Sequence, residues 1–251
     1  MNTVNNFVVI ESVYGKFLLN RHCAFQAEAL IKTGRTHIES ELANILALVD
    51  CLPTDCLVVD GGANAGFFTV PVAQRIKQKG GRVIAFEPQR EIFNGLAGTI
   101  ALNDLSNVRL NRMGLGDLAG SATVPDVDYS VDQDFGIVSI TQNSTVGDLY
   151  SMVVDQQQVQ TIRLDDLNLP RLDFYKLDVE GFEIAALNGS RDTIIKHRPI
   201  MWIEYWKLGL DTVVDAVRYL KDYDHYVMDP LNVLFVPRER AQEYQLQFKQ
   251  G

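Results

Sequence analysis

Three clusters of glycine or acidic residues follow short apolar runs, and their residue types suit nucleotide binding and proton transfer. The first is VVDGGANAGFF at residues 58–68, which contains one acid and three glycines. The second is Glu87 at the end of VIAFE, and the third is KLDVEGFE at residues 176–183. Ligands of open parallel sheets bind beyond the carboxyl ends of the strands. The three clusters therefore predict one shared cleft.

The glycine turn discriminates between classes of nucleotide. A dinucleotide fingerprint has the form G-x-G-x-x-G, and its central glycine clears space for the pyrophosphate. In GGANAG this central position is Ala63, and the acid Asp60 just before the glycines would repel a pyrophosphate. No GKS or GKT of an ATP-binding loop follows the turn. An acid at Glu87 for the ribose hydroxyls, together with a carboxylate for a cationic end, instead predicts S-adenosylmethionine.

Acids at two neighbouring strand ends predict the reaction centre. Asp178 and Glu180 follow the strand LDFYKL, and Glu204 ends the strand MWIE. A hydroxyl acceptor must lose its proton, so a carboxylate within hydrogen-bond reach is a candidate general base. Alternatively, Asp178 caps the next helix or pairs with Lys176, and Glu180 interacts with the helix dipole. These oxygens also suit a divalent metal, but no spacing requires one and a metal is not favoured.

Strand-like runs alternate with apolar-periodic helices from residue 51 onward. Strands are expected at 56–60, 82–88, 107–117, 172–181 and 199–206, and helices at 66–79, 89–102 and 212–223. Nearly continuous apolar strands of this kind indicate a parallel sheet with helices on both faces. The final segment DHYVMDPLNVLFVP predicts two strands around a turn, which would add antiparallel edge strands.

Two segments lie outside this alternation. IESELANILALVD at 38–50 has an apolar helical face. Residues 1–50 are expected to form a strand and a helical lid over the C-terminal edge of the sheet. Residues 118–160 are expected to be an insertion on the substrate side, within a single α/β domain over 51–251.

The composition limits the classes of partner. With 23 basic and 32 acidic residues, the chain has a formal net charge of −9, so nucleic acid is not an expected partner. The three cysteines lack a disulfide or zinc spacing and suit a reducing compartment. The N-terminus does not resemble a signal peptide, and no apolar run reaches the ~20 residues that span a bilayer. A cytoplasmic protein is expected, and its oligomeric state stays open.

The motifs VVDGGANAGFFT, VIAFEPQ and LDFYKLDVEGFEIAALNG together resemble the FkbM family of S-adenosylmethionine-dependent methyltransferases over residues 36–206. The resemblance implies a Rossmann-like class I methyltransferase fold for 51–251. Its sheet would be seven-stranded and mostly parallel, with helices on both faces and a C-terminal antiparallel hairpin. It also implies methyl transfer to a hydroxyl of a sugar, a glycan or a small natural product.

The resemblance also implies site roles. Cofactor-binding residues are expected in the glycine turn and at the two following strand ends: Asp60, Gly61, Gly62, Asn64, Gly66, Phe67, Glu87, Pro88, Gly116 and Asp117. Glu87 would hold the ribose, and Gly116 with Asp117 would lie near the adenine. Weaker acceptor-side candidates are found in the lid, in the insertion and after the fifth strand: His37, Phe135, Gly136, Tyr205 and Trp206.

Two other functions remain open at this point. One is an NAD(P)-dependent oxidoreductase, which the glycine turn disfavours. The other is a non-catalytic cofactor-binding protein on a methyltransferase scaffold. The acids at 178, 180 and 204 favour a working enzyme, because a retired site does not need them.

Overall fold

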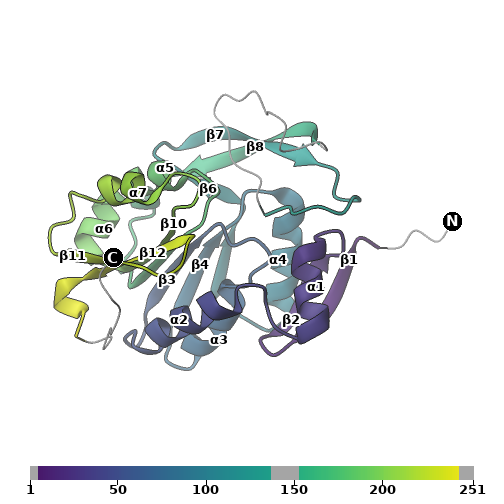
Figure 1. Cartoon of the computed structure of the whole chain (residues 1–251), viewed down its shortest axis with the longest axis horizontal. Coiled ribbons are helices and arrows are strands. Elements are labelled where there is room, and N and C mark those ends of the chain that lie inside the picture. Colours follow the sequence, from purple (N-terminus) through teal and green to yellow (C-terminus); the bar gives the residue numbers. More distant parts are fainter. Residues whose placement is uncertain (1–4, 137–152, 243–251) are drawn as a thin grey trace.

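A seven-stranded β-sheet forms the centre of the protein. The computed structural model describes residues 5–136 and 153–242 (Figure 1). In spatial order the sheet contains β11 (Tyr223–Val227), β12 (Asn232–Pro237), β10 (Ile200–Glu204), β9 (Phe174–Leu177), β3 (Leu57–Gly61), β4 (Arg82–Phe86) and β5 (Val108–Asn111). From β10 to β5 the strands run parallel. Their carboxyl ends therefore lie along one edge, as the sequence predicts.

The C-terminal hairpin is present, but it is not simply added at the edge. The strand β12 pairs antiparallel with both β10 and β11, so it lies inside the sheet and β11 is the edge strand. The chain passes beyond the position of β12 through α7 (Leu210–Ala216) and then returns to fill the gap. Only β12 runs against the other strands, and the prediction of two antiparallel edge strands is wrong in this respect.

Helices cover both faces of the sheet, which confirms the predicted layers. One core cluster joins the sheet to α2 (Glu39–Asp50), α3 (Thr69–Lys77) and α4 (Arg90–Leu102). The other joins it to α5 (Glu183–Asn188), α6 (Arg191–His197) and α7. Val58 belongs to the first cluster, whereas Leu57 and Val59 belong to the second. Successive side chains of a strand point to opposite faces, so β3 supports both cores.

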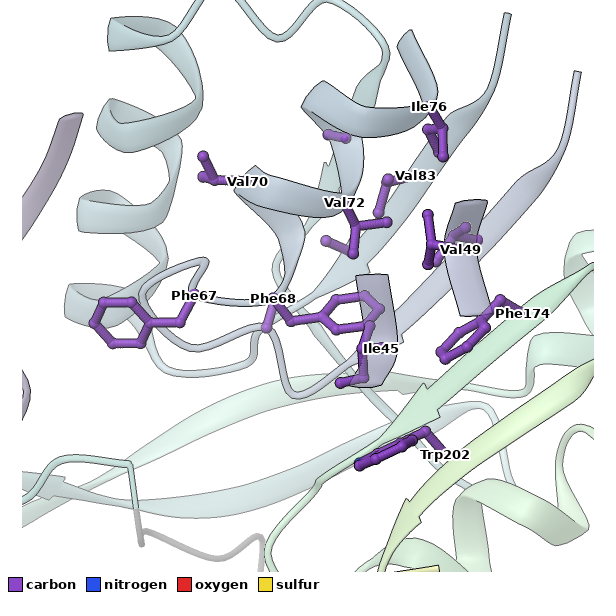
Figure 2. Packing of buried hydrophobic residues seen from close by; sticks show 14 of the residues in the cluster. Ile45, Val49, Phe67, Phe68, Val70, Val72, Ile76, Val83, Phe174 and Trp202 are labelled. Atoms are coloured by element: carbon purple, nitrogen blue, oxygen red, sulfur yellow. The ribbon is translucent and has the colours of Figure 1, made fainter. Parts of the chain in front are cut away.

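The predicted helix at 38–50 is α2, and it is part of the main core. Figure 2 shows Ile45 and Val49 of this helix beside Phe174 of the sheet, and Trp202 belongs to the same core cluster. Most of α2 therefore covers a face of the sheet, because its apolar side is needed there. Only its N-terminal end, with Ile38 and Glu41, borders the cleft at the carboxyl ends of the strands.

The remaining N-terminal elements pack beside this layer (Figure 1). They are β1 (Phe7–Ser12), β2 (Gly15–Asn20) and α1 (Ala24–Thr33). β1 and β2 form an antiparallel hairpin. Its strand β2 is tied to α4, because the Leu18 amide donates to the Thr99 hydroxyl and the Lys16 amide donates to Asn103.

A second, three-stranded sheet contains part of the predicted insertion. It consists of β6 (Met113–Leu115), β8 (Val153–Ile162) and β7 (Gly120–Val127). The Arg90 amide at the start of α4 donates to the Gln157 side chain, which joins this sheet to the main domain. Residues 137–152 of the insertion lie outside the described residues.

Two short 3₁₀ helices complete the fold at Leu164–Leu167 and Arg238–Arg240. The predicted helix at 212–223 ends earlier, at Ala216, and turns lead from there to β11. Within the described residues, no helix combines the length and hydropathy required to cross a lipid bilayer.

Candidate active site

Two adjoining pockets open at the carboxyl ends of β3, β4 and β9. The first has a volume of about 510 Å³ and extends from the glycine turn past the ends of β4 and β6. The second has a volume of about 370 Å³ and lies between the glycine turn and the start of α2. Gly62, Asn64 and Asp178 line both. The three sequence clusters thus meet in one cleft, in agreement with the prediction.

The glycine turn is shaped by close backbone contacts. Gly62 has a φ of +77°, and a β-carbon there would lie 1.7 Å from the carbonyl oxygen of Asp178, so only glycine fits. The Gly62 and Ala63 amides donate to the Phe86 carbonyl. Gly66 also has a positive φ, and a β-carbon there would meet Leu96 at 2.9 Å. The turn is therefore fixed against the ends of β4 and β9.

Glu87 forms part of the wall of the first pocket and is held by main-chain donors. Its Oε2 accepts from the Asn64 amide and its Oε1 accepts from the Gln89 amide, both at 2.9 Å. The residue is 4% exposed, and burial raises the pKa of its carboxyl to about 7 even though both amides lower it. A ligand hydroxyl in this pocket would meet a carboxyl of fixed orientation.

Asp60 does not face either pocket. It is fully buried, its Oδ2 accepts from the Thr69 hydroxyl, and its Oδ1 lies 3.3 Å from Lys176 Nζ. The same lysine donates to the Gly62 carbonyl and lies 3.4 Å from Asp178. Although burial lowers it, the charges of Asp60 and Asp178 raise the pKa of Lys176 above its usual value. Asp60 is thus compensated inside the protein and acts on the glycine turn through Lys176.

Asp178, Glu180 and Glu204 form an acidic cluster beside the cleft. Their carboxylate oxygens lie within 4.8 Å of one another. Burial, and then the charges of Asp178 and Glu180, raise the pKa of Glu204 to about 10. Glu204 therefore carries a proton at neutral pH and donates a hydrogen bond more readily than it accepts a proton. This leaves Asp178 and Glu180 as the carboxylates able to take one.

Two lysines balance the rest of the cluster. Lys207 Nζ lies 2.5 Å from Glu180, and Lys176 pairs with Asp178. Burial, followed by the charge of Asp178, raises the pKa of Glu180 to about 7. Glu180 also has a φ of +57°, a strained backbone conformation for a side chain of this size. The three oxygens have the chemistry of a Mg²⁺ or Ca²⁺ site, but the two lysines and the proton on Glu204 already compensate their charge.

Comparisons with known proteins identify the family of this chain. The model of the FkbM methyltransferase domain matches residues 60–225. The chain belongs to this family. Methyltransferase 1 of Beauveria bassiana (strain ARSEF 2860) is 29% identical over an alignment of 179 residues, and the match covers 64% of each chain. Methyltransferase sdnD of Sordaria araneosa is 27% identical over 191 residues, covering 66% of this chain and 68% of that one.

A solved FkbM methyltransferase, from Methylobacillus flagellatus KT, shares the fold. Its TM-score is 0.50 at 20% sequence identity, and the match covers 72% of this chain and 43% of the other. This likeness shows a Rossmann-like methyltransferase fold, as the sequence resemblance implied. The present chain spans about two thirds of the length of the two fungal relatives and less than half of the bacterial one.

Within this FkbM fold, the cofactor-side residues expected from the sequence separate into two groups. Those that line the first pocket are Gly62, Asn64, Glu87 and Pro88. The others support the turn from outside this pocket. Gly61 packs under Leu177, where a β-carbon would come within 2.8 Å, and the Phe67 ring packs edge-on against His37 in the second pocket.

The predicted adenine-side residues are displaced. Gly116 and Asp117 do not line the first pocket, whereas Met113, Gly114 and Leu115 do. β6 itself pairs with β8, the Gly116 amide that follows donates to the Ile162 carbonyl, and the Gly116 carbonyl lies 1.8 Å from where a β-carbon on Gly189 would be. The pocket is thus lined by the strand itself in place of the loop that follows, and an adenine contact at this strand end stays a prediction.

The acceptor-side candidates are dispersed. Gly136 lines the first pocket, while Phe135 is fully buried in a small cluster beneath it. The Tyr205 hydroxyl donates to the Asp229 carbonyl, and Trp206 is exposed with Lys207 over its ring. These two aromatic residues line neither pocket, because β10 ends before them and the chain turns away from the cleft.

Several pocket residues were not singled out by the sequence. They include Gln89, Met113, Leu115 and Val179 in the first pocket, and Gln26 and Glu41 in the second. Gln89 and Val179 directly follow predicted site residues, so proximity in the chain is a usable signal. Glu41 had no such signal, because its place depends on how α2 packs against the sheet.

Proposed function

We propose that this chain is an S-adenosylmethionine-dependent O-methyltransferase. The observation that carries the proposal is the buried Glu87 carboxyl, which two main-chain amides hold at the wall of a pocket that begins at the glycine turn. An acid fixed in this way can accept both hydroxyls of a ribose. Gly62 leaves room for the sulfonium, and the apolar side chains of Met113 and Leu115 suit the adenine.

Asp178 is the proposed general base. It borders both pockets, so it lies next to the point where a methyl group on sulfur would face an acceptor. Methyl transfer is an in-line displacement on a cofactor that is already reactive, so the protein must mainly align the two reactants and exclude water. The acceptor hydroxyl would lose its proton to Asp178, while the protonated Glu204 would donate a hydrogen bond within the cluster.

We propose a hydroxyl of a sugar, a glycan or a small natural product as the acceptor, and the cytoplasm as the place of action. Support for a small acceptor comes from the formal net charge of −9 and from the acidic cluster, both of which oppose polyphosphate chains. No divalent metal is proposed, because lysines balance the cluster.

A methyl-transfer screen tests this function. The protein is incubated with radiolabelled S-adenosylmethionine and pools of nucleotide sugars, glycans, polyketides and transfer RNA, with and without EDTA. Label in a small hydroxylated product, retained in EDTA, is the expected result. Label only in RNA would overturn the proposed acceptor class. No transfer despite cofactor binding would favour a non-catalytic binding protein, and binding of NAD(P) alone would favour an oxidoreductase.

A further inference from the structure

The cationic end of the proposed cofactor needs a carboxylate partner, and Asp60 is not available for this role. Asp60 is fully buried, and its two oxygens already contact Lys176 and Thr69. An ammonium group in the cleft could reach it only by displacing the lysine. Asp60 therefore has a structural role. The negative charge that partners the ammonium group of the cofactor must come from another element.

The second pocket supplies such a counter-charge. It is bounded by the glycine turn on one side and by the start of α2 on the other, and Glu41 lies in the first turn of that helix. Glu41, Asp178 and Lys176 are its acidic and basic lining residues. Because Lys176 also compensates the buried Asp60, the lining as a whole favours a positive ligand group. Gln26 and His37 add uncharged hydrogen-bonding groups.

The Glu41 carboxyl is poised to respond to a positive charge. Burial raises its pKa to about 7, whereas Lys176 and the Trp202 indole lower the pKa and Asp178 and Asp229 raise it further. His37 faces the same pocket, and burial lowers its pKa, so it contributes no competing positive charge at neutral pH. An ammonium group beside Glu41 would favour the ionised carboxylate and gain a charge-assisted hydrogen bond.

The arrangement of the two pockets fixes which part of the ligand arrives there. With the ribose at Glu87 in the first pocket, the only shared lining is Gly62, Asn64 and Asp178. The sulfur must sit at this boundary, because it joins the ribose carbon to the rest of the cofactor. Asp178 lines both pockets, whereas Glu180 lines the first and not the second. The second pocket is then left for the amino-acid end.

On the basis of the proposed function, we infer that the second pocket binds the α-amino-acid end of the cofactor, with Glu41 of α2 as the partner of its ammonium group. The N-terminal end of α2 is thus a binding element. Its apolar face is anchored in the core through Ile45 and Val49, which holds Glu41 in place before the ligand binds. The gain in affinity follows from this pre-organisation.

The test compares two ligands that differ only at that end. S-Adenosylhomocysteine carries the amino-acid group, whereas 5′-methylthioadenosine has the same adenosine and sulfur without it. Calorimetry gives the Kd of both for the wild type, for Glu41→Gln and for the control Glu39→Gln. Glu39 lies in the same helical turn, but its carboxylate bonds to Tyr14 and Arg35 outside the pocket. Gln replaces the carboxyl without a change in size, so α2 is expected to stay folded.

We expect Glu41→Gln to raise the Kd of S-adenosylhomocysteine about 10- to 100-fold, as for the loss of a charge-assisted hydrogen bond. The Kd of 5′-methylthioadenosine should stay within about twofold of the wild-type value. Glu39→Gln should change neither Kd. If Glu41→Gln raises the Kd of both ligands equally, or of neither, the inference is wrong while the proposed function stands. If the wild type binds neither ligand, the proposed function itself fails, and the inference fails with it.

Discussion

The two sides of the cleft hold their acids in different ways. At the end of β4, Glu87 is fixed by main-chain amides of the glycine turn and of α4. At the ends of β9 and β10, Asp178, Glu180 and Glu204 are held by two lysines and by one another. Main-chain amides do not titrate, whereas the charges of an acidic cluster change with pH. We therefore expect the proposed cofactor side to be preformed and the proposed acceptor side to respond to pH.

Removing the base on the acceptor side should have the largest effect. We expect Asp178→Asn to lower kcat by about 10²- to 10⁴-fold, the contribution typical of general base catalysis. The Kd of S-adenosylhomocysteine should change by less than about tenfold, since Glu87 and the glycine turn remain. Single-turnover transfer and calorimetry on the same preparation measure both. Unchanged kcat would exclude Asp178 as the base.

The cofactor side contains an acid whose role is predicted to be structural. Among the described residues, Asp60→Asn leaves Lys176 with Asp178 as its ion-pair partner, and breaking a buried ion pair costs about 3–5 kcal/mol of unfolding free energy. Urea unfolding should show this loss, while cofactor affinity at low temperature stays near that of the wild type. A large loss of affinity in a protein of normal stability would instead place Asp60 at the ligand, as the sequence alone predicted.

Glu87 offers the matching change on the ligand side of the same turn. Glu87→Gln should raise the Kd of S-adenosylhomocysteine about 10- to 100-fold. The variant side chain keeps one acceptor oxygen in place of two, and its NH₂ group faces a main-chain donor. Unfolding free energy should fall far less than in Asp60→Asn. Adenine should bind both the wild type and the variant equally, because it has no ribose. A rise in the Kd of adenine as large as that of S-adenosylhomocysteine would indicate a collapsed pocket.

The acceptor side also predicts a pH dependence of stability. In the unfolded chain Glu204 ionises near its ordinary pKa of 4.5, but in the folded protein it keeps its proton up to a pKa of about 10. Between these values the folded state binds more protons, so stability falls as the pH rises. The contribution is at most about 1.4 kcal/mol per pH unit. Glu204→Gln should flatten the decrease of Tm between pH 6 and 9, and an unchanged slope would contradict a protonated Glu204 in the folded protein.

The sequence predicted the parts of the site that depend on strand ends. The carboxyl ends of parallel strands share an edge, so Gly62, Glu87 and Asp178 could be placed together without a structure. It could not show that Asp60 and Lys176 are neighbours in the register of β3 and β9, which removes Asp60 from the cleft. It also could not place Glu41, because that depends on the packing of α2 in the core. The position of β12 between β10 and β11 could not be predicted either, because it depends on strand pairing between distant parts of the chain.

The most direct test of the central claim is a calorimetric titration of the wild-type chain with S-adenosylhomocysteine and, separately, with NAD and NADP. The account predicts one binding site for S-adenosylhomocysteine, lost or strongly weakened in Glu87→Gln, and no heat from either dinucleotide. Binding of NAD or NADP with no response to S-adenosylhomocysteine would contradict it.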